Sequence, residues 1–295
     1  MEFKKAERKK IKLKIALIGP SGAGKTYSAL RLAKGMSDKI AMIDTENKRA
    51  EIYANEFDFD VLNIDAPYTP EKYIEAIELA GKAGYEVLII DSMSHEWIGK
   101  GGILEISSKM PDKNDFTKWA KLTPRHEAFI TAITMSDMHI ICTLRGKDEY
   151  VVEENDKGKK APRKIGVGSK QRDGFEYECT VSLLVDQEKH VATVMKDNTH
   201  IFENRYESLT EEHGKMLLEW ATQGKDEVKK ISTEQAKKLC AIAGKENELA
   251  KLVIGEFNYY SSTDISVADY DKICNRLKEV IEADKKLNQE QLALS

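Results

Sequence analysis

Cysteine is scarce in this 295-residue sequence, and the four cysteines that occur lie far apart along the chain. Because no C-x-x-C pair is present, a zinc site or a disulfide framework is disfavoured, and reduced thiols in a cytoplasm are the better interpretation. Long apolar stretches are missing as well: no run reaches about 18 apolar residues, and none follows the basic N-terminal segment as a signal peptide requires. We therefore expect a soluble cytoplasmic protein that is neither secreted nor membrane-spanning.

A surplus of charge of either sign is also absent, because 46 Lys and Arg residues face 50 Asp and Glu residues and the formal net charge is −4. This balance excludes a polycation, so any surface for nucleic acid must be a local patch. Seven of the first fourteen residues are basic. This segment is either an arm that contacts a phosphate backbone or a solubilising tail.

The most informative segment that is present is a glycine-rich motif. Gly19, four further residues and then Gly24-Lys25-Thr26 satisfy the spacing G-x-x-x-x-G-K-[ST], between an apolar run and a helical pattern. Glycine lets backbone N–H groups approach a phosphate, and the following helix directs its positive end at the same anion. Lys25 supplies a cation for the phosphates of ATP, and Thr26 a hydroxyl for Mg²⁺. The predicted nucleotide-binding residues of this loop are Gly19, Pro20, Ser21, Gly22, Ala23, Gly24, Lys25, Thr26 and Tyr27.

Strand and helix patterns alternate along the first half of the chain. Strand-like runs occupy residues 15–18, 39–46, 58–65, 85–92 and 139–144, and helical patterns occupy 27–34, 70–83 and 116–135. The run at 85–92 is continuously apolar, which is typical of a strand buried on both faces of a parallel sheet. The alternation predicts an α/β fold with a doubly wound, mainly parallel twisted sheet and right-handed crossovers.

The pattern changes after this alternation. We interpret the polar stretch 146–172 as a β-hairpin with a flexible tip, and two later strands as an antiparallel extension of the sheet. These strands are expected at 177–186 and 190–197, a closing helix at 209–221 with Thr210 as N-cap, and further helices at 232–243, 246–257 and 266–283. The predicted organisation is an ATPase core at 1–223, a linker at 224–230 and a helical C-terminal module with little core of its own at 231–295.

Nucleotide sites in open parallel sheets lie at the carboxyl ends of the strands, and three strand ends here carry suitable groups. Asp91 is predicted to bind Mg²⁺ opposite Thr26. Glu46, at the end of a neighbouring strand, is either the general base that activates water or an exposed strand-end acid. Arg145 and Thr143 either sense the γ-phosphate or are satisfied strand-end residues.

A second cluster of candidate residues is basic. Residues 157–172 contain seven Lys or Arg residues and no acid, a composition suited to a phosphate backbone. An ordinary solvated loop is the competing interpretation. Trp97, in an earlier loop, either stacks on bases or packs in the protein. The predicted DNA-binding residues are Trp97, Lys100, Lys159, Lys160, Arg163, Lys164, Lys170 and Arg172.

Two blocks, IAMIDTENKRAEIYANEFDFDVLNI and PEKYIEAIELAGKAGYEVLIIDSMS, resemble the core of RecA-type recombinases, and the resemblance covers most of residues 12–205. Within that superfamily the chain most resembles the short phage-encoded RecA-like ATPases that accompany single-strand annealing proteins. The resemblance implies that Glu46 is the catalytic glutamate, Tyr53 the adenine-stacking tyrosine and Asp91 the metal-site aspartate. It also implies DNA-binding loops at 95–102 and 146–172, and a lysine finger, Lys196, that reaches a neighbouring subunit's ATP site.

The sequence departs from that family at two positions. Asn198 stands where the family has a second cationic finger, and CTLRG lacks the family's glutamine switch. Activation by a neighbouring subunit would then rest on one charge, and coupling between ATP and DNA would use other groups.

These observations predict an ATP-hydrolysing, Mg²⁺-dependent recombination protein that binds single-stranded DNA. The catalytic residues are expected to be Glu46, Lys25, Lys196 and Arg145. The resemblance further implies self-assembly into a filament or ring, a single-strand annealing or single-strand-binding partner, and a phage protein in a bacterial cytoplasm. A P-loop phosphotransferase and a nucleotide-gated adaptor remain alternatives, although no arginine-rich lid favours the phosphotransferase.

Overall fold

The apolar runs form one twisted sheet in the computed structural model, which describes residues 3, 5–111, 114–154, 160–225, 230–244 and 247–293, with backbone alone for residues 148–154, 160–167, 247 and 287–293. The strand order is β3-β2-β4-β5-β1-β7-β8, with β6 paired to β5. The strands are β1 Lys14–Gly19, β2 Ile40–Asp44, β3 Asp60–Asn63, β4 Val87–Asp91, β5 His139–Glu154, β6 Lys160–Ser169, β7 Val181–Val185 and β8 Ala192–Asp197. Neighbours are parallel from β3 to β7, and β8 is antiparallel to β7. The predicted α/β fold is therefore confirmed.

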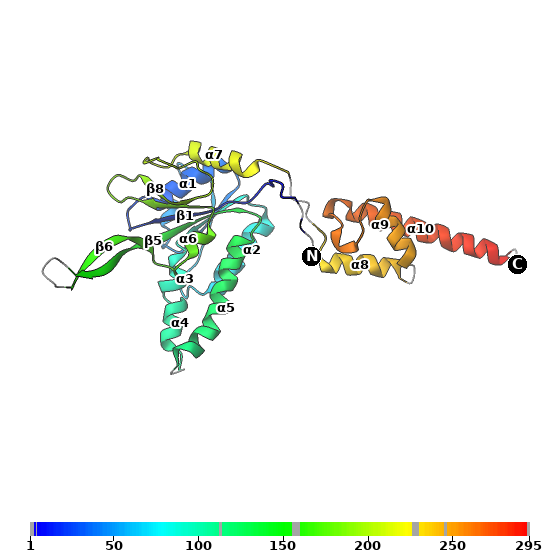
Figure 1. Ribbon diagram of the computed structural model, residues 1–295, viewed down its shortest axis with the longest axis horizontal. Helices are drawn as coiled ribbons and strands as arrows, with labels where there is room; N and C mark the ends of the chain where they lie inside the picture. Colours follow the sequence, from blue (N-terminus) through cyan, green and yellow to red (C-terminus); the bar gives the residue numbers. More distant parts are fainter. Residues whose placement is uncertain are drawn as a thin grey trace. The chain divides into compact units, whose positions relative to one another are not determined.

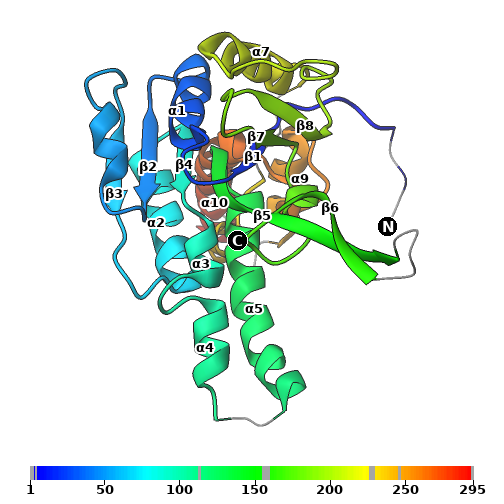
Figure 2. The same cartoon turned by 90° about the vertical axis from the view of Figure 1, so that its left-hand side faces the viewer.

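Helices cover both faces of this sheet, as Figure 2 shows. On one face, α1 (Lys25–Met36) and α7 (Glu211–Thr222) bury apolar side chains against the strands. On the other face, α2 (Pro70–Ala83) and α5 (Asp115–Thr134) do the same. The strand β4 is buried along its whole length, as its continuous apolar run predicts.

Local sequence sets the bounds of α2. Pro70 occupies its first turn, where the missing N–H of proline costs no hydrogen bond. Gly84 ends the helix in the left-handed conformation, with φ of 84°, and donates its N–H to carbonyls of the last turn. Tyr73 and Ala80, two turns apart, are buried toward the sheet. The predicted helix is confirmed at both ends.

The strands β5 and β6 continue as an antiparallel hairpin, which Figure 1 shows projecting as a two-stranded ribbon. The hairpin predicted within 146–172 is confirmed, and residues 155–159 at its predicted tip lie outside the described residues. The register sets the basic strand β6 against four acidic residues of β5, with Glu154 opposite Lys160. Across 146–172 the sequence holds eight basic and five acidic residues, so the positive charge of the hairpin is smaller than that of 157–172 alone.

Five short elements in the described part of the chain have no counterpart in the expectation from sequence. They are the 3-10 helices η1 (Arg49–Tyr53) and η2 (Ser262–Asp264) and the helices α3 (Ser94–Ile98), α4 (Ile103–Lys109) and α6 (Phe175–Glu178). The strand expected at 177–186 begins only at Val181, because the short helix α6 (Phe175–Glu178) precedes it. Elements of one or two turns are too short to display a repeated apolar spacing, so periodicity does not reveal them.

The sheet and its helices lie within Lys10–Gln223, and a second compact unit comprises Gly224–Ser295 together with Met1–Lys9. Its elements are α8 (Thr233–Ala243), α9 (Asn247–Glu256), the 3-10 helix η2 (Ser262–Asp264) and α10 (Val267–Ala293). The expectation of little core is wrong here, because Leu239, Val253 and Leu277 belong to a cluster of eleven buried residues. Residues 226–229 of the predicted linker lie outside the described residues. Of the helices in the described part of the chain, none combines the length and the apolar character of a membrane span.

Candidate functional site

The loop between β1 and α1 has the backbone that an anion site requires. The strand ends at Gly19, and the helix begins at Lys25 with Gly24 as its N-cap. Gly22 and Gly24 have φ angles of 82° and 84°, which glycine adopts without strain. The first turn of α1 contains no acidic side chain, so no carboxylate of the helix itself competes for the positive end of the helix and its N–H groups. This cradle fits a phosphate group.

The side chain of Lys25 folds back over the same loop. Its Nζ donates to the carbonyl oxygens of Gly19 at 2.9 Å and Pro20 at 2.8 Å. Burial lowers the pKa of Lys25, and the nearby carboxylates of Asp91 and Glu46 act in the opposite direction. A bound phosphate would add negative charge beside the ammonium and favour its charged form.

Asp91 provides the oxygen ligands that a magnesium ion prefers. It ends β4 and is buried, and its carboxylate accepts hydrogen bonds from the hydroxyls of Thr26, at 2.6 Å, and Thr143. Burial raises the pKa of Asp91, while the two hydroxyl groups lower it. A carboxylate beside a hydroxyl suits a hard cation, so Asp91 and Thr26 fit the predicted Mg²⁺ site. When bound, the ion would neutralise charge on the phosphates.

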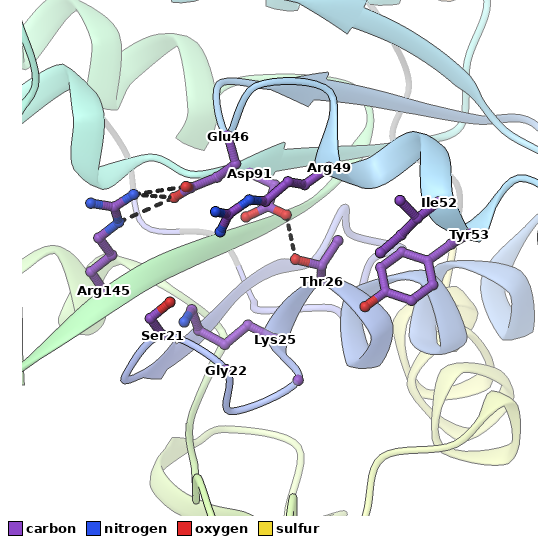
Figure 3. Close-up of a pocket in the computed structure, with 11 residues that line it drawn as sticks. Ser21, Gly22, Lys25, Thr26, Glu46, Arg49, Ile52, Tyr53, Asp91 and Arg145 are labelled. Atoms are coloured by element: carbon purple, nitrogen blue, oxygen red, sulfur yellow. Dashed lines mark hydrogen bonds and ion pairs between the residues drawn. The ribbon is translucent and has the colours of Figure 1, made fainter.

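Glu46 and Arg145 form an ion pair at one end of the pocket (Figure 3). Arg145 Nη2 lies 2.7 Å from each carboxylate oxygen, and its Nε donates to Oε1 at 3.1 Å. The predicted general base, Glu46, and the predicted γ-phosphate sensor, Arg145, are therefore bound to each other. Arg145 also adjoins the hairpin, because the N–H of Lys170 donates to its carbonyl oxygen at 2.6 Å. Opening of this pair when nucleotide is bound would free the Glu46 carboxylate for its predicted role.

His95, in the first predicted DNA-binding loop, is a further neighbour of Glu46. Its Nδ1 lies 2.8 Å from Thr45 Oγ1, its Nε2 lies 3.8 Å from Glu46 Oε1, and its ring stacks on Tyr68 at 4.9 Å. Burial lowers the pKa of His95, so the ring is neutral at pH 7 and the contact with Glu46 is not an ion pair. His95 thus packs against the strand end that carries Glu46.

The last two residues of η1 line the other end of the pocket. Tyr53, the predicted adenine-stacking residue, lies there beside Ile52 (Figure 3). Tyr27 packs against Tyr53 with ring centroids 5.5 Å apart but does not itself line the pocket. Arg49, the first residue of η1, also lines the pocket, although it was not predicted from the sequence. The only available signal was a basic residue three positions after Glu46.

The site therefore combines residues from the phosphate loop, the carboxyl ends of β2 and β4, the interior of β5, and η1. Its lining residues are Ser21, Gly22, Gly24, Lys25, Thr26, Glu46, Arg49, Ile52, Tyr53, Asp91 and Arg145. Gly19, Pro20 and Ala23, which were also predicted to bind nucleotide, shape the loop from outside the lining.

The turn between β7 and β8 braces the phosphate loop, a role that the sequence did not reveal. Gln187 Nε2 donates to the carbonyl oxygen of Ser21 at 3.0 Å, and His190 Nδ1 lies 3.1 Å from that of Ala23. These contacts join residues more than 160 positions apart, so only the folded sheet brings them together.

Lys196, the predicted finger, lies on β8 and does not line the pocket of its own chain. Its ammonium donates to the carbonyl oxygen of Tyr177. The N–H of Asn198 donates to the carbonyl of Thr180. A role for Lys196 in a neighbouring subunit's site stays a prediction.

Among the predicted DNA-binding residues, Trp97 is engaged within the protein. Its ring stacks on Trp119 with centroids 5.8 Å apart and lies 5.1 Å from the ring of His126. Lys100 is exposed at the turn between α3 and α4. Base stacking on Trp97 would therefore compete with contacts that the fold already makes.

The remaining DNA-binding candidates lie on or beside the hairpin. Lys170 is exposed, and Arg172 lies 3.9 Å from Glu127. Lys160, Arg163 and Lys164 lie on β6, where the backbone alone is described, and Lys159 lies outside the described residues.

Comparison with known proteins identifies a family for the part of the chain that carries the pocket. A family model described as an AAA domain matches residues 11–213. The matched span runs from β1 into α7 and contains every residue that lines the pocket. No curated protein matches the chain.

Proposed function

The chain belongs to the AAA domain family, whose P-loop ATPase domains bind and hydrolyse nucleotide, and on this premise we propose that it is an ATP-hydrolysing recombination protein that binds single-stranded DNA and assists annealing or strand exchange. One observation carries the proposal of ATP hydrolysis. The pocket brings the glycine-rich loop and Lys25 together with two separate carboxylates, Asp91 for the metal ion and Glu46 for the attacking water. Charge stabilisation and a positioned base are the two requirements for transferring a phosphoryl group to water.

The contacts around Arg145 support coupling between this pocket and the hairpin. Arg145 is the residue of β5 that pairs with Glu46, and the hairpin begins at the next residue. A polyanion that moved the hairpin would move Arg145 and thereby change the freedom of Glu46. Coupling of this kind needs no glutamine switch in the segment CTLRG, which lies within β5.

The proposal is tested by the rate of phosphate release with Mg²⁺ and ATP, in the absence and presence of a single-stranded oligonucleotide. We expect turnover in both cases and a faster rate with DNA. Nucleotide binding without any turnover would favour the adaptor, whereas phosphate transfer to a small-molecule acceptor in preference to water would favour the phosphotransferase.

The basic residues of the hairpin give a prediction about DNA affinity. Neutralising six basic residues on or beside the hairpin should weaken binding to every DNA sequence about equally, because phosphate contacts do not depend on the sequence. Each lost phosphate contact should also lower the slope of log K against log salt by roughly 0.7 on single strands. Basal ATP hydrolysis should change little, and its stimulation by DNA should fall. The residues to change are Lys159, Lys160, Arg163, Lys164, Lys170 and Arg172. Fluorescence anisotropy with a labelled oligonucleotide at several salt concentrations measures the slope.

A matched control removes the same number of exposed lysines from the C-terminal unit. These lysines are Lys237, Lys238, Lys251, Lys272, Lys278 and Lys285. A salt slope that falls in the control but not in the hairpin variant would identify the hairpin as an ordinary solvated loop.

A further prediction concerns Lys196. If this residue completes the site of a neighbouring subunit, Lys196→Ala should lower ATP turnover, and mixing it with Lys25→Ala should restore activity. At equal concentrations, about a quarter of head-to-tail interfaces would pair an intact loop with an intact finger. Phosphate release from the mixture measures the recovery.

The control for this experiment is Lys189→Ala, which changes another lysine near β8 whose ammonium lies over the ring of Tyr206. It should retain full turnover alone and need no complementation. A chain that stays monomeric with ATP and DNA, as measured by light scattering, would refute the shared site.

A further inference from the structure

Arg49 is the cation of the pocket that the proposed function leaves without a role. The other two pocket-lining cations are engaged, Lys25 with carbonyl oxygens of the loop and Arg145 with Glu46. Arg49 is exposed and makes no hydrogen bond or ion pair with any residue that the structure describes. An arginine directed into a pocket without a protein partner is available to a ligand.

The position of Arg49 is fixed by a buried carboxylate. Asp44, which is 2% exposed at the end of β2, accepts hydrogen bonds from the N–H of Glu46 through Oδ1 and from the N–H of Ala50 through Oδ2 at 3.0 Å. Between these anchors the chain reverses direction through Asn47 and Lys48, which have φ angles of 60° and 63°. One carboxylate thus sets the loop that presents both Glu46 and Arg49 to the pocket.

The direction of the side chain indicates which part of a nucleotide it would meet. Figure 3 shows Arg49 extending from η1 across the pocket, so that its guanidinium ends on the side where Glu46, Asp91 and Lys25 lie and away from Tyr53. This is the metal-binding corner, and a base that activates water must lie next to the terminal phosphate. Ile52 and Tyr53 occupy the other end.

The chemistry of the group fits a phosphate. A guanidinium presents a planar set of N–H donors that matches two phosphate oxygens, and it stays charged at any physiological pH. The pocket already holds two carboxylates, Glu46 and Asp91, so a third cation keeps the site favourable for a polyanion. Resting on the proposed ATPase function, we propose that Arg49 binds the γ-phosphate of ATP and makes the pocket prefer a nucleoside triphosphate to a diphosphate.

The test uses isothermal titration calorimetry in the presence of Mg²⁺ to compare the affinities of two probes. One probe is a non-hydrolysable β,γ-imido analogue of ATP, and the other is ADP. Arg49→Ala should weaken binding of the triphosphate analogue by about 10- to 100-fold, the usual worth of a hydrogen bond to a charged group, and leave ADP binding unchanged. Arg49→Lys should lose less, because it keeps the charge without the planar fork.

The matched control is Lys48→Asn, which removes the adjacent charge on the same loop. Asparagine tolerates the left-handed backbone of this position, and Lys48 does not line the pocket, so both affinities should stay unchanged. Thermal melting without ligand checks that each variant is folded.

Failure of this inference is distinguishable from failure of the proposed function. Equal losses for both probes, or no loss for either, in Arg49→Ala would overturn the role at the γ-phosphate while leaving the ATPase proposal intact. If the unchanged protein binds neither probe, the proposed function itself fails.

Discussion

Replacing Lys25 by alanine should abolish ATP hydrolysis and weaken nucleotide binding severely, because Lys25 is the mobile cation of the phosphate loop. No other Lys or Arg residue lies between Gly19 and Thr26. The backbone N–H groups of the loop would remain, but they lack the full charge that the β- and γ-phosphates require. Phosphate release and calorimetric titration with ATP measure the two effects.

The fold should survive this change. The variant loses two hydrogen bonds from Nζ to loop carbonyls, but it also removes an ammonium whose pKa burial lowers, so these two effects on stability oppose each other. A net loss of about 1 kcal/mol would lower the melting temperature by roughly 2–4 °C in a domain of this size. Lys34→Ala, further along α1 with its ammonium over the ring of Phe57, is the matched control. Unchanged ATP turnover in Lys25→Ala would remove the basis of the functional proposal.

The phosphate loop, the parallel sheet and the bounds of α2 could be predicted from the sequence because each depends on neighbouring residues. Glycine spacing, continuous apolar runs and helix end signals are local patterns, and the structure reproduces them. Asp91 and Glu46 could be proposed because strand ends in a parallel sheet converge on one edge. The geometry puts both in one pocket with Lys25.

What could not be predicted depends either on residues far apart in the chain or on backbone hydrogen bonds that leave no pattern in the sequence. The ion pair between Glu46 and Arg145 spans 99 positions, and it engages two groups that the sequence suggested would act separately on nucleotide. The presentation of Arg49 depends on hydrogen bonds from backbone N–H groups to Asp44, which no side-chain pattern reveals. In the hairpin, acidic residues of β5 lie opposite basic residues of β6. The basic run could be recognised in the sequence, but its pairing with the acidic residues could not.

Glu46→Gln should retain ATP binding and lose hydrolysis by roughly 10²- to 10⁴-fold, because an amide keeps the shape of the carboxylate but cannot accept a proton from water. The amide also loses the charge that pairs with Arg145, so the guanidinium becomes available to bound phosphate. We therefore expect the dissociation constant for ATP to stay the same or fall while turnover collapses, and ATP-bound complexes should persist on DNA. Single-turnover phosphate release together with calorimetry separates the two quantities.

Two other glutamates, Glu51 and Glu96, lie near this site in the chain, and Glu51 provides the control. Glu51 accepts a hydrogen bond from Asn63 Nδ2 at 3.1 Å, and Glu96 is fully buried beside His126, and neither lines the pocket. Glu51→Gln should therefore leave turnover unchanged. If Glu46→Gln instead hydrolyses ATP at the original rate, Glu46 is not the base. Asp91 would then be the remaining carboxylate in the described lining, although its predicted role is to bind the metal ion, and its carboxylate already accepts hydrogen bonds from two threonine hydroxyls.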